Sequence, residues 1–157
     1  HPKTIKPLQN KSIPLYVKCF LDPALPGTII HNKTLKHLPP IIVIKNDQVL
    51  LHLHATDFSF IDEHTMSHLY HLFAEHTIRP GLIQTGAVSL MVCADEREGK
   101  IDRLAAEAAA MFDVRVEKRL TLLTIRHYTP EVLDAMTAGK AVVLRQQSKE
   151  MVQVLMR

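Results

Sequence analysis

The sequence predicts an α+β fold made of two related units, each with helices on one face of an antiparallel sheet. Two observations lead to this prediction. From Gln48 to Lys118 the chain reads strand, helix, strand, strand, helix, strand, with alternating apolar residues in the strands and spacings of three and four in the helices. From Leu120 onward it reads strand, helix, strand, strand, which is a shorter copy of the same pattern.

The composition is that of a soluble globular protein. Of the 157 residues, 46% are apolar and 22% are charged, and the formal net charge is +3. Scattered Lys and Arg residues and the absence of Trp argue against nucleic acid as a partner. No apolar run approaches the roughly 20 residues that cross a bilayer, and no signal peptide is evident, so we expect a cytoplasmic protein without a membrane partner. Cys19 and Cys93 are expected to be reduced.

The first 40 residues are expected to be a lead-in to the two units. Pro2 suits the first turn of a short helix, Ile13–Phe20 is rich in β-branched and aromatic residues and predicts a strand, and Thr28–Ile30 predicts a brief one. Lys36–Pro40 ends in prolines, which makes it the best candidate boundary in the chain.

The strands that follow set the predicted limits of the two units. Ile41–Lys45 is a continuous apolar run and predicts a buried strand, and Asn46-Asp47 predicts a turn after it. Gln48–His54 alternates and predicts an antiparallel strand. Because the second unit lacks a fourth strand, Ile41–Lys45 is expected to supply its missing edge. The predicted boundaries are 1–40 for the lead-in, 47–119 for the first unit, and 41–46 with 120–157 for the second.

Three helices are predicted in these units. Asp62 is expected to cap the first, and Gly99–Phe112 is alanine-rich and predicts the second. Thr129-Pro130-Glu131 predicts the start of the third, and Gly139 its end. The apolar stripe of the first helix is Met66, Leu69, Leu72 and Phe73. Each unit would leave its other face or an edge open, which favours pairing with a second copy.

No catalytic constellation is evident. His64, His68 and His71 could share one helix face, so a metal-binding module is one alternative, but no HExxH pattern occurs and a solvated face is favoured. Gly139-Lys140 resembles the tail of a phosphate-binding loop, yet Asp134 stands where that motif needs a glycine. Residue chemistry therefore favours a ligand-binding or interaction module over an enzyme.

Three stretches resemble the C-terminal part of aspartate kinases, with its paired ACT regulatory domains. The first, HPKTIKPLQNKSIPLYVKCFLDPALPGTII, resembles the segment that ends the catalytic domain. The second, QVLLHLHATD with the following helix and GLIQTGAVSLMVCAD, resembles the first ACT unit. The third, RLTLLTIRHYTPEVLDAMTAG with its two strands, resembles the second ACT unit, so the resemblance covers nearly the whole chain.

The resemblance implies two ferredoxin-like (ACT) units and a regulatory role. In this family the amino-terminal domain transfers phosphate from ATP to aspartate, with ATP and Mg as cofactors, and opens the route to lysine, threonine and methionine. The ACT units pair, often as a homodimer, and bind an end-product amino acid that inhibits the kinase. The implied partners are a parent kinase domain and lysine or threonine as effector, with no catalytic residue, metal or cofactor in this chain.

The family's effector site corresponds to residues at the helix start after the first strand and to residues on the second strand. These are Phe58, Ser59, His64, Thr65 and Met66, and Pro80, Gly81, Gln84 and Thr85. Free N–H groups at a helix start would bind the effector's carboxylate. Lysine-sensitive members usually place Asp where this chain has Gly81, and Ser-Glu where it has Gly86-Ala87. Asp62 and Glu63 would also repel an incoming carboxylate.

Two further alternatives stay open. One is a stand-alone amino-acid-binding ACT protein, and the other is a purely structural dimerisation module with no effector. The segment His1–Ile30 has no obvious purpose in a stand-alone ACT protein, which favours the kinase interpretation.

Overall fold

The structure is a computed structural model that describes residues 2–32, 38–56, 59–97 and 99–157. It consists of two compact units, His1–Leu38 and Pro39–Arg157. Their division falls in the proline-ended connector that the sequence marks as a boundary. The finer division into 47–119 and 41–46 with 120–157 stays a prediction.

The unit His1–Leu38 contains one helix and a two-stranded antiparallel sheet. These elements are α1 (Pro2–Asn10), β1 (Leu15–Val17) and β2 (Thr28–Ile30). The predicted short helix and brief strand are confirmed, whereas the predicted strand Ile13–Phe20 is reduced to three residues. Gly27 closes the hairpin at φ +70°, and a Cβ there would lie 2.4 Å from the Val17 carbonyl oxygen, so only glycine fits.

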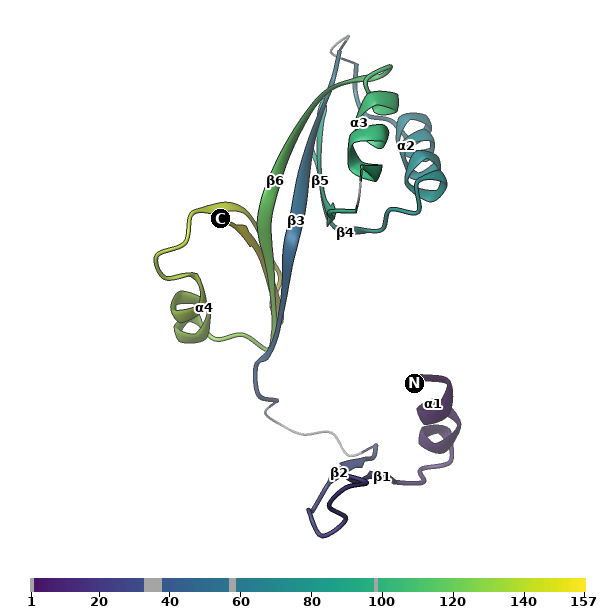
Figure 1. The fold of residues 1–157 in the computed structure, drawn as a ribbon, viewed down its shortest axis with the longest axis vertical. Helices are drawn as coiled ribbons and strands as arrows, with labels where there is room; N and C mark the ends of the chain where they lie inside the picture. The colour runs from purple at the N-terminus through teal and green to yellow at the C-terminus, as the bar shows by residue number, and fades with distance from the viewer. Residues whose placement is uncertain (1, 33–37, 57–58, 98) are drawn as a thin grey trace. The chain divides into compact units, whose positions relative to one another are not determined.

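The unit Pro39–Arg157 holds one six-stranded antiparallel sheet and three helices (Figure 1). Its elements are β3 (Ile41–Ala55), α2 (Glu63–Glu75), β4 (Pro80–Thr85), β5 (Ser89–Asp95), α3 (Lys100–Ala108), β6 (Phe112–Arg126), α4 (Pro130–Thr137), β7 (Val142–Gln147) and β8 (Met151–Met156). The strand order is β4-β5-β3-β6-β8-β7. The predicted α+β class with antiparallel pairing is confirmed. Among the described residues, no helix is long and apolar enough to cross a bilayer.

The prediction of a turn at Asn46-Asp47 is wrong, because β3 runs through it without a break. Between Lys45 and Gln48, β3 advances three residues while β6 advances two, and between Gln48 and Leu50 the imbalance is reversed. These are two compensating β-bulges, and Asp47 (φ 52°) and Arg119 (φ 61°) adopt left-handed backbone there. Asp tolerates this conformation well, so the same residue pair can serve a bulge or a turn.

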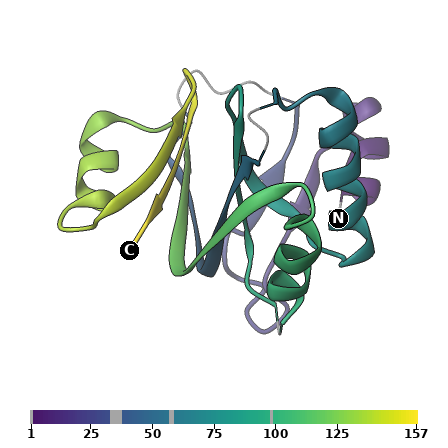
Figure 2. The same cartoon turned by 90° about the horizontal axis from the view of Figure 1, so that it is seen from above.

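Each bulge moves the side chains of one strand to the opposite face of the sheet, since side chains alternate with a period of two. Because each strand has one bulge, Val116 and Leu123 of β6 both lie on the helix-covered face, under different helices and in separate cores. Figure 2 shows α4 at one end of this unit and α2 and α3 at the other. The core under α2 and α3 includes Leu51, and the core under α4 includes Leu123. As predicted, Ile41–Lys45 pairs with the second half, at residues 122–126 of β6.

A third core lies on the sheet face that carries no helix. All six strands contribute to it, through Leu50, Leu82, Cys93, Leu120, Leu122, Leu144 and Leu155. The Gln146 amide nitrogen donates to the Ile83 carbonyl at 2.7 Å, which links the edge strands β7 and β4. Of the two expected alternatives, an open face or an open edge, the face is closed in this part of the sheet because the two halves bury these leucines against each other, whereas an edge at Ile41–Ile44 stays exposed.

Two further expectations are corrected. The segment Ile41–Lys45 is not buried, because its first four side chains are 43–51% exposed. It forms the edge of the half of the sheet that α4 covers. The predicted helix Gly99–Phe112 ends at Ala108, since Phe112 is buried as the first residue of β6, in register with Ala55.

Gln48 is the buried polar residue at the double bulge. Its side chain is 1% exposed; its amide nitrogen donates to Asp95 Oδ1 at 2.9 Å and to the Asn46 carbonyl at 3.0 Å, and its oxygen accepts from Cys93 Sγ at 3.7 Å. The hydrogen bond from Gln48, followed by that from Lys45, lowers the pKa of Asp95. Burial raises the pKa of the Cys93 thiol to about 11, so this thiol stays protonated at neutral pH.

We predict that Gln48→Ala lowers the free energy of unfolding by about 1–3 kcal/mol, because it leaves buried polar groups at the bulge without partners. Urea unfolding measures this, and Gln84→Ala, on an exposed β4 side chain, is the matched control, with an expected change within about 0.5 kcal/mol. The folded-state pKa of Asp95 is lowered, so its contribution is present above 3.8 and is lost as the pH falls through the lowered value. The effect of Gln48→Ala should therefore shrink in acid, and equal losses in both variants would contradict the assignment.

Candidate functional site

The first turn of α2 is the part of the predicted effector site that the sequence determines most directly. Asp62 precedes the helix in extended conformation, and its Oδ1 accepts a hydrogen bond from the Thr65 N–H at 2.8 Å. Hydrogen bonding from the Thr65 side chain, followed by that from the Thr65 backbone N–H, lowers the pKa of Asp62. The predicted cap is confirmed, and it means that the protein's own carboxylate already occupies an N–H group that an effector's carboxylate would use.

A hollow lies beside this helix start, where β3 ends and β6 begins. Its lining residues are Ala55, Thr56, Ser59, Phe60, Ile61, Thr65, Ala110, Met111 and Phe112. We call it the helix-start hollow. Its volume is about 290 Å³, at the lower end for small-molecule sites. Among the residues that the structure describes, the side chains that line it are apolar or carry hydroxyl groups, and none of them is charged.

Only part of the predicted effector set meets at this hollow. Ser59 and Thr65 line it. His64 is exposed on the outer side of the helix, and Met66 packs against the core under α2 and α3. Phe58 lies outside the described residues.

The four predicted residues of β4 lie elsewhere. Gln84 and Thr85 are exposed, and Pro80 starts the strand. Gly81 sits at a register shift, where a Cβ would be 3.5 Å from Leu122 Cδ2 and thus face the helix-free core. Within one chain, the structure therefore does not bring β4 into the helix-start hollow.

Sequence reasoning missed the wall formed by Ala110, Met111 and Phe112. The predicted helix ran through these residues, so they were assigned to a helix face and not to a turn. The apolar Phe112 directly before the alternating segment DVRVEK was the signal for an earlier strand start.

The histidines of α2 do not converge. His64 and His68 are exposed, and His71 lies 3.4 Å from Glu75 one turn further along the helix. In the ranges that the structure describes, no group of three or more His, Cys, Asp or Glu residues could hold a metal ion.

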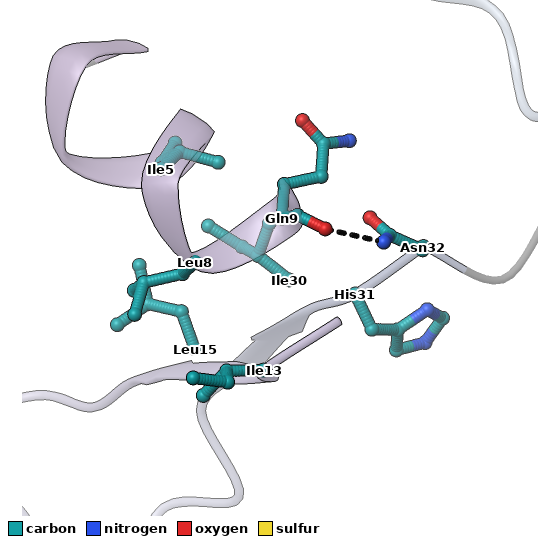
Figure 3. Close-up of a pocket in the computed structure, with 8 residues that line it drawn as sticks. All are labelled: Ile5, Leu8, Gln9, Ile13, Leu15, Ile30, His31 and Asn32. Carbon is teal, nitrogen blue, oxygen red and sulfur yellow. Dashed lines mark hydrogen bonds between the residues drawn. The ribbon is translucent and has the colours of Figure 1, made fainter. Parts of the chain in front are cut away.

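A second hollow lies within the unit His1–Leu38 (Figure 3). Its volume is about 10 Å³, enough for a single water molecule, and its lining is mainly aliphatic, with Ile5, Leu8 and Ile30 among the contributors. The Asn32 amide donates to the Gln9 carbonyl at 2.6 Å across its rim. It is the small core of this unit and has no room for an organic ligand.

Comparison with known proteins gives the family context. No protein-family model matches the chain. Over 135 residues it is 28% identical to lysine-sensitive aspartokinase 3 of Escherichia coli strain K12, an alignment that covers 80% of this chain and 29% of that protein. The crystal structure of the aspartate kinase of Clostridium acetobutylicum matches with a TM-score of 0.81 and 15% identity, over 100% of this chain and 41% of that one.

A third match has the same fold in a separate regulatory subunit. The regulatory subunit of aspartate kinase from Thermus thermophilus matches with a TM-score of 0.52 and 14% identity, over 73% of this chain and 85% of the subunit. The chain is related to the C-terminal regulatory region of aspartate kinases. The resemblance read from the sequence is thereby confirmed. The chain spans less than a third of the length of lysine-sensitive aspartokinase 3.

We predict that Asp62→Ala lowers the thermal midpoint of this regulatory-region chain, because the Thr65 N–H loses its acceptor. Asp62→Asn keeps an acceptor and should retain most of the stability. The pKa of Asp62 is lowered in the folded protein, so the contribution of its charge is present above 3.8 and disappears as the pH falls through the lowered value. Thermal unfolding of both variants at neutral pH and below pH 3.8 checks this, and a midpoint unaffected by Asp62→Ala would contradict the capping role.

Proposed function

We propose that this chain is the regulatory part of an aspartate kinase and that it acts by pairing and by amino-acid sensing, without catalysis of its own. The observation that supports the proposal most strongly is the alignment of most of this chain with only 29% of lysine-sensitive aspartokinase 3. The parent enzyme would use ATP and Mg to phosphorylate aspartate, the first step toward lysine, threonine and methionine.

The unit His1–Leu38 is proposed to be the end of the kinase domain. Its hairpin presents Phe20 and Leu21 at 94% and 91% exposure, and Tyr16 at 62%. Exposing side chains of this size loses the free energy that their burial would provide, about 1.5–3 kcal/mol each. Such residues fit a segment that completes a larger domain.

The unit Pro39–Arg157 is proposed to hold two ferredoxin-like (ACT) units that form a homodimer. The strand order β4-β5-β3-β6 with two helices on one face supports the first unit, and β7-β8-β6-β3 with α4 supports the shorter second one. The open edge at Ile41–Ile44 has four half-exposed apolar side chains, which supports pairing with a second copy.

We propose that lysine and threonine are weak effectors of this chain. The described residues that line the helix-start hollow carry no charge that could hold the two charges of an amino acid, and Asp62 already uses the Thr65 N–H. If the β4 residues Gln84 and Thr85 take part, they would have to come from the partner subunit of the dimer, since they do not reach the hollow in one chain.

In isothermal titration we expect lysine and threonine to bind weakly or not at all to the wild-type chain. Asp62→Asn removes a negative charge from the helix start while it keeps the cap, so binding should strengthen. Asp134→Asn, an exposed position on α4, is the control for the change in net charge. Low-micromolar binding of either amino acid to the wild type would overturn the proposal of a weak site.

In sedimentation equilibrium we expect a monomer–dimer equilibrium. Ile44→Lys places a charge on the apolar edge of β3, and Thr85→Lys places one on β4, so the variant that shifts the equilibrium toward monomer identifies the edge that pairs. A wild-type chain that stays monomeric at every concentration would contradict the homodimer.

The stand-alone ACT protein remains the second candidate. The two proposals differ in what the gene encodes upstream of His1. A reading frame with the lysine- and glycine-rich phosphate loop of the kinase domain supports the first proposal, and a start codon at this position supports the second.

A further inference from the structure

We propose that the hollow at the C-terminal end of α2 binds the phosphate group of a small molecule. Its lining residues are Phe73, Ala74, Thr77, Ile78, Arg79 and Arg97. Two of these six residues are arginines and none is acidic. This hollow is separate from the helix-start hollow, which lies at the other end of the same helix.

Positive charge continues on the other side of Thr77. A neighbouring hollow is lined by Thr77, Lys100 and Arg103, together with His76 and Glu75. Glu75 and His76 already have partners: Glu75 lies 3.4 Å from His71, and His76 lies 3.1 Å from Glu107. Four cationic side chains therefore surround Thr77, namely Arg79, Arg97, Lys100 and Arg103.

These cations are poorly neutralised by the protein itself. Arg97 reaches Asp95 at 3.8 Å, and that carboxylate also pairs with Lys45 at 3.1 Å. Among the described residues, Arg79 and Arg103 make no ion pair. Cationic side chains gathered on both sides of Thr77 repel one another, and an anion placed between Arg79 and Arg97 reduces that repulsion.

Thr77 supplies an independent observation. It follows α2 at φ 55°, in the left-handed position of the helix end, where glycine or asparagine is usual. A β-branched residue is strained there. The Thr77 hydroxyl is also a hydrogen-bond group between the two hollows: it receives a hydrogen bond from the Lys100 ammonium and donates to the His76 carbonyl. Backbone strain of this kind indicates that the side chain at the position has a function.

The chemistry of the lining favours phosphate over a single carboxylate. A carboxylate is satisfied by one guanidinium fork, whereas a phosphate monoester carries close to two negative charges and three acceptor oxygens. Arg79 and Arg97 can each offer two N–H donors to such a group, and the Lys100 ammonium, which the Thr77 hydroxyl holds by a hydrogen bond, adds further donors. Phe73 and Ile78 form the apolar floor beside them.

The test is titration of the whole 157-residue chain with inorganic phosphate at constant ionic strength, followed by amide NMR shifts and by the thermal midpoint. We expect saturable shifts around Thr77 and a midpoint that rises with phosphate. Arg79→Gln and Arg97→Gln should each weaken binding about tenfold, the usual effect of losing a charge-assisted hydrogen bond. Arg126→Gln, an exposed position on β6, makes the same charge change and should leave binding unaltered.

Thr77→Gly separates a binding role from a structural one. Glycine adopts the left-handed conformation without strain, so the midpoint in the absence of phosphate should not fall, while phosphate binding weakens. The proposal is overturned if phosphate causes no saturable shift at millimolar concentration, or if Arg126→Gln weakens binding as much as Arg79→Gln. Binding of L-aspartate as tight as that of phosphate would also overturn it, because carboxylate groups would then satisfy the site as well as a phosphate group does.

Discussion

The architecture depends on the pair of compensating bulges where β3 and β6 cross the middle of the sheet. They shift the alternation of side chains by one residue within each of the two 15-residue strands and bend the strands there. With them, Leu51 packs under α2 and α3 while Leu123 packs under α4, and the leucines of the remaining face meet in a third core. Gln48 fixes this point, because it satisfies the polar groups that the bulges leave unpaired.

Burying the helix-free face changes which surfaces remain for a partner. Leu50, Leu122 and Leu155 are fully or almost fully buried within the chain, so this part of the sheet face is closed to a partner. The edges differ among themselves. The β4 carbonyl of Ile83 is taken by Gln146, whereas the start of β3 keeps apolar side chains half exposed. The proposed pairing between copies would therefore use edges more than faces.

Local signals predicted local structure well. Asp62 and Thr129 are each followed three residues later by the N–H group that they cap, so their roles depend on neighbours in sequence alone. The conformation of Asn46-Asp47 could not be predicted from its neighbours in sequence. Whether such a pair makes a turn or a bulge is decided by the strands beside it, and β5 pairs with β3 only from Gln48 onward. For the same reason the hollow lined by Ser59 and Phe112 was seen only in part, since its walls come from segments more than fifty residues apart.

The position of the helix-start hollow relative to the long strands offers a physical route for the proposed sensing. Ala55 and Phe112, which line it, form the last pair of the β3–β6 ladder, and Ile41 and Arg126 form the pair at its other end. At about 3.3 Å per residue, the ladder is roughly 50 Å long before twist is taken into account. A ligand that separates Ala55 from Phe112 acts on the one element that both halves share. The bulge at Gln48 lies between the two ends, so its rigidity sets how much of that displacement reaches the exposed edge of β3.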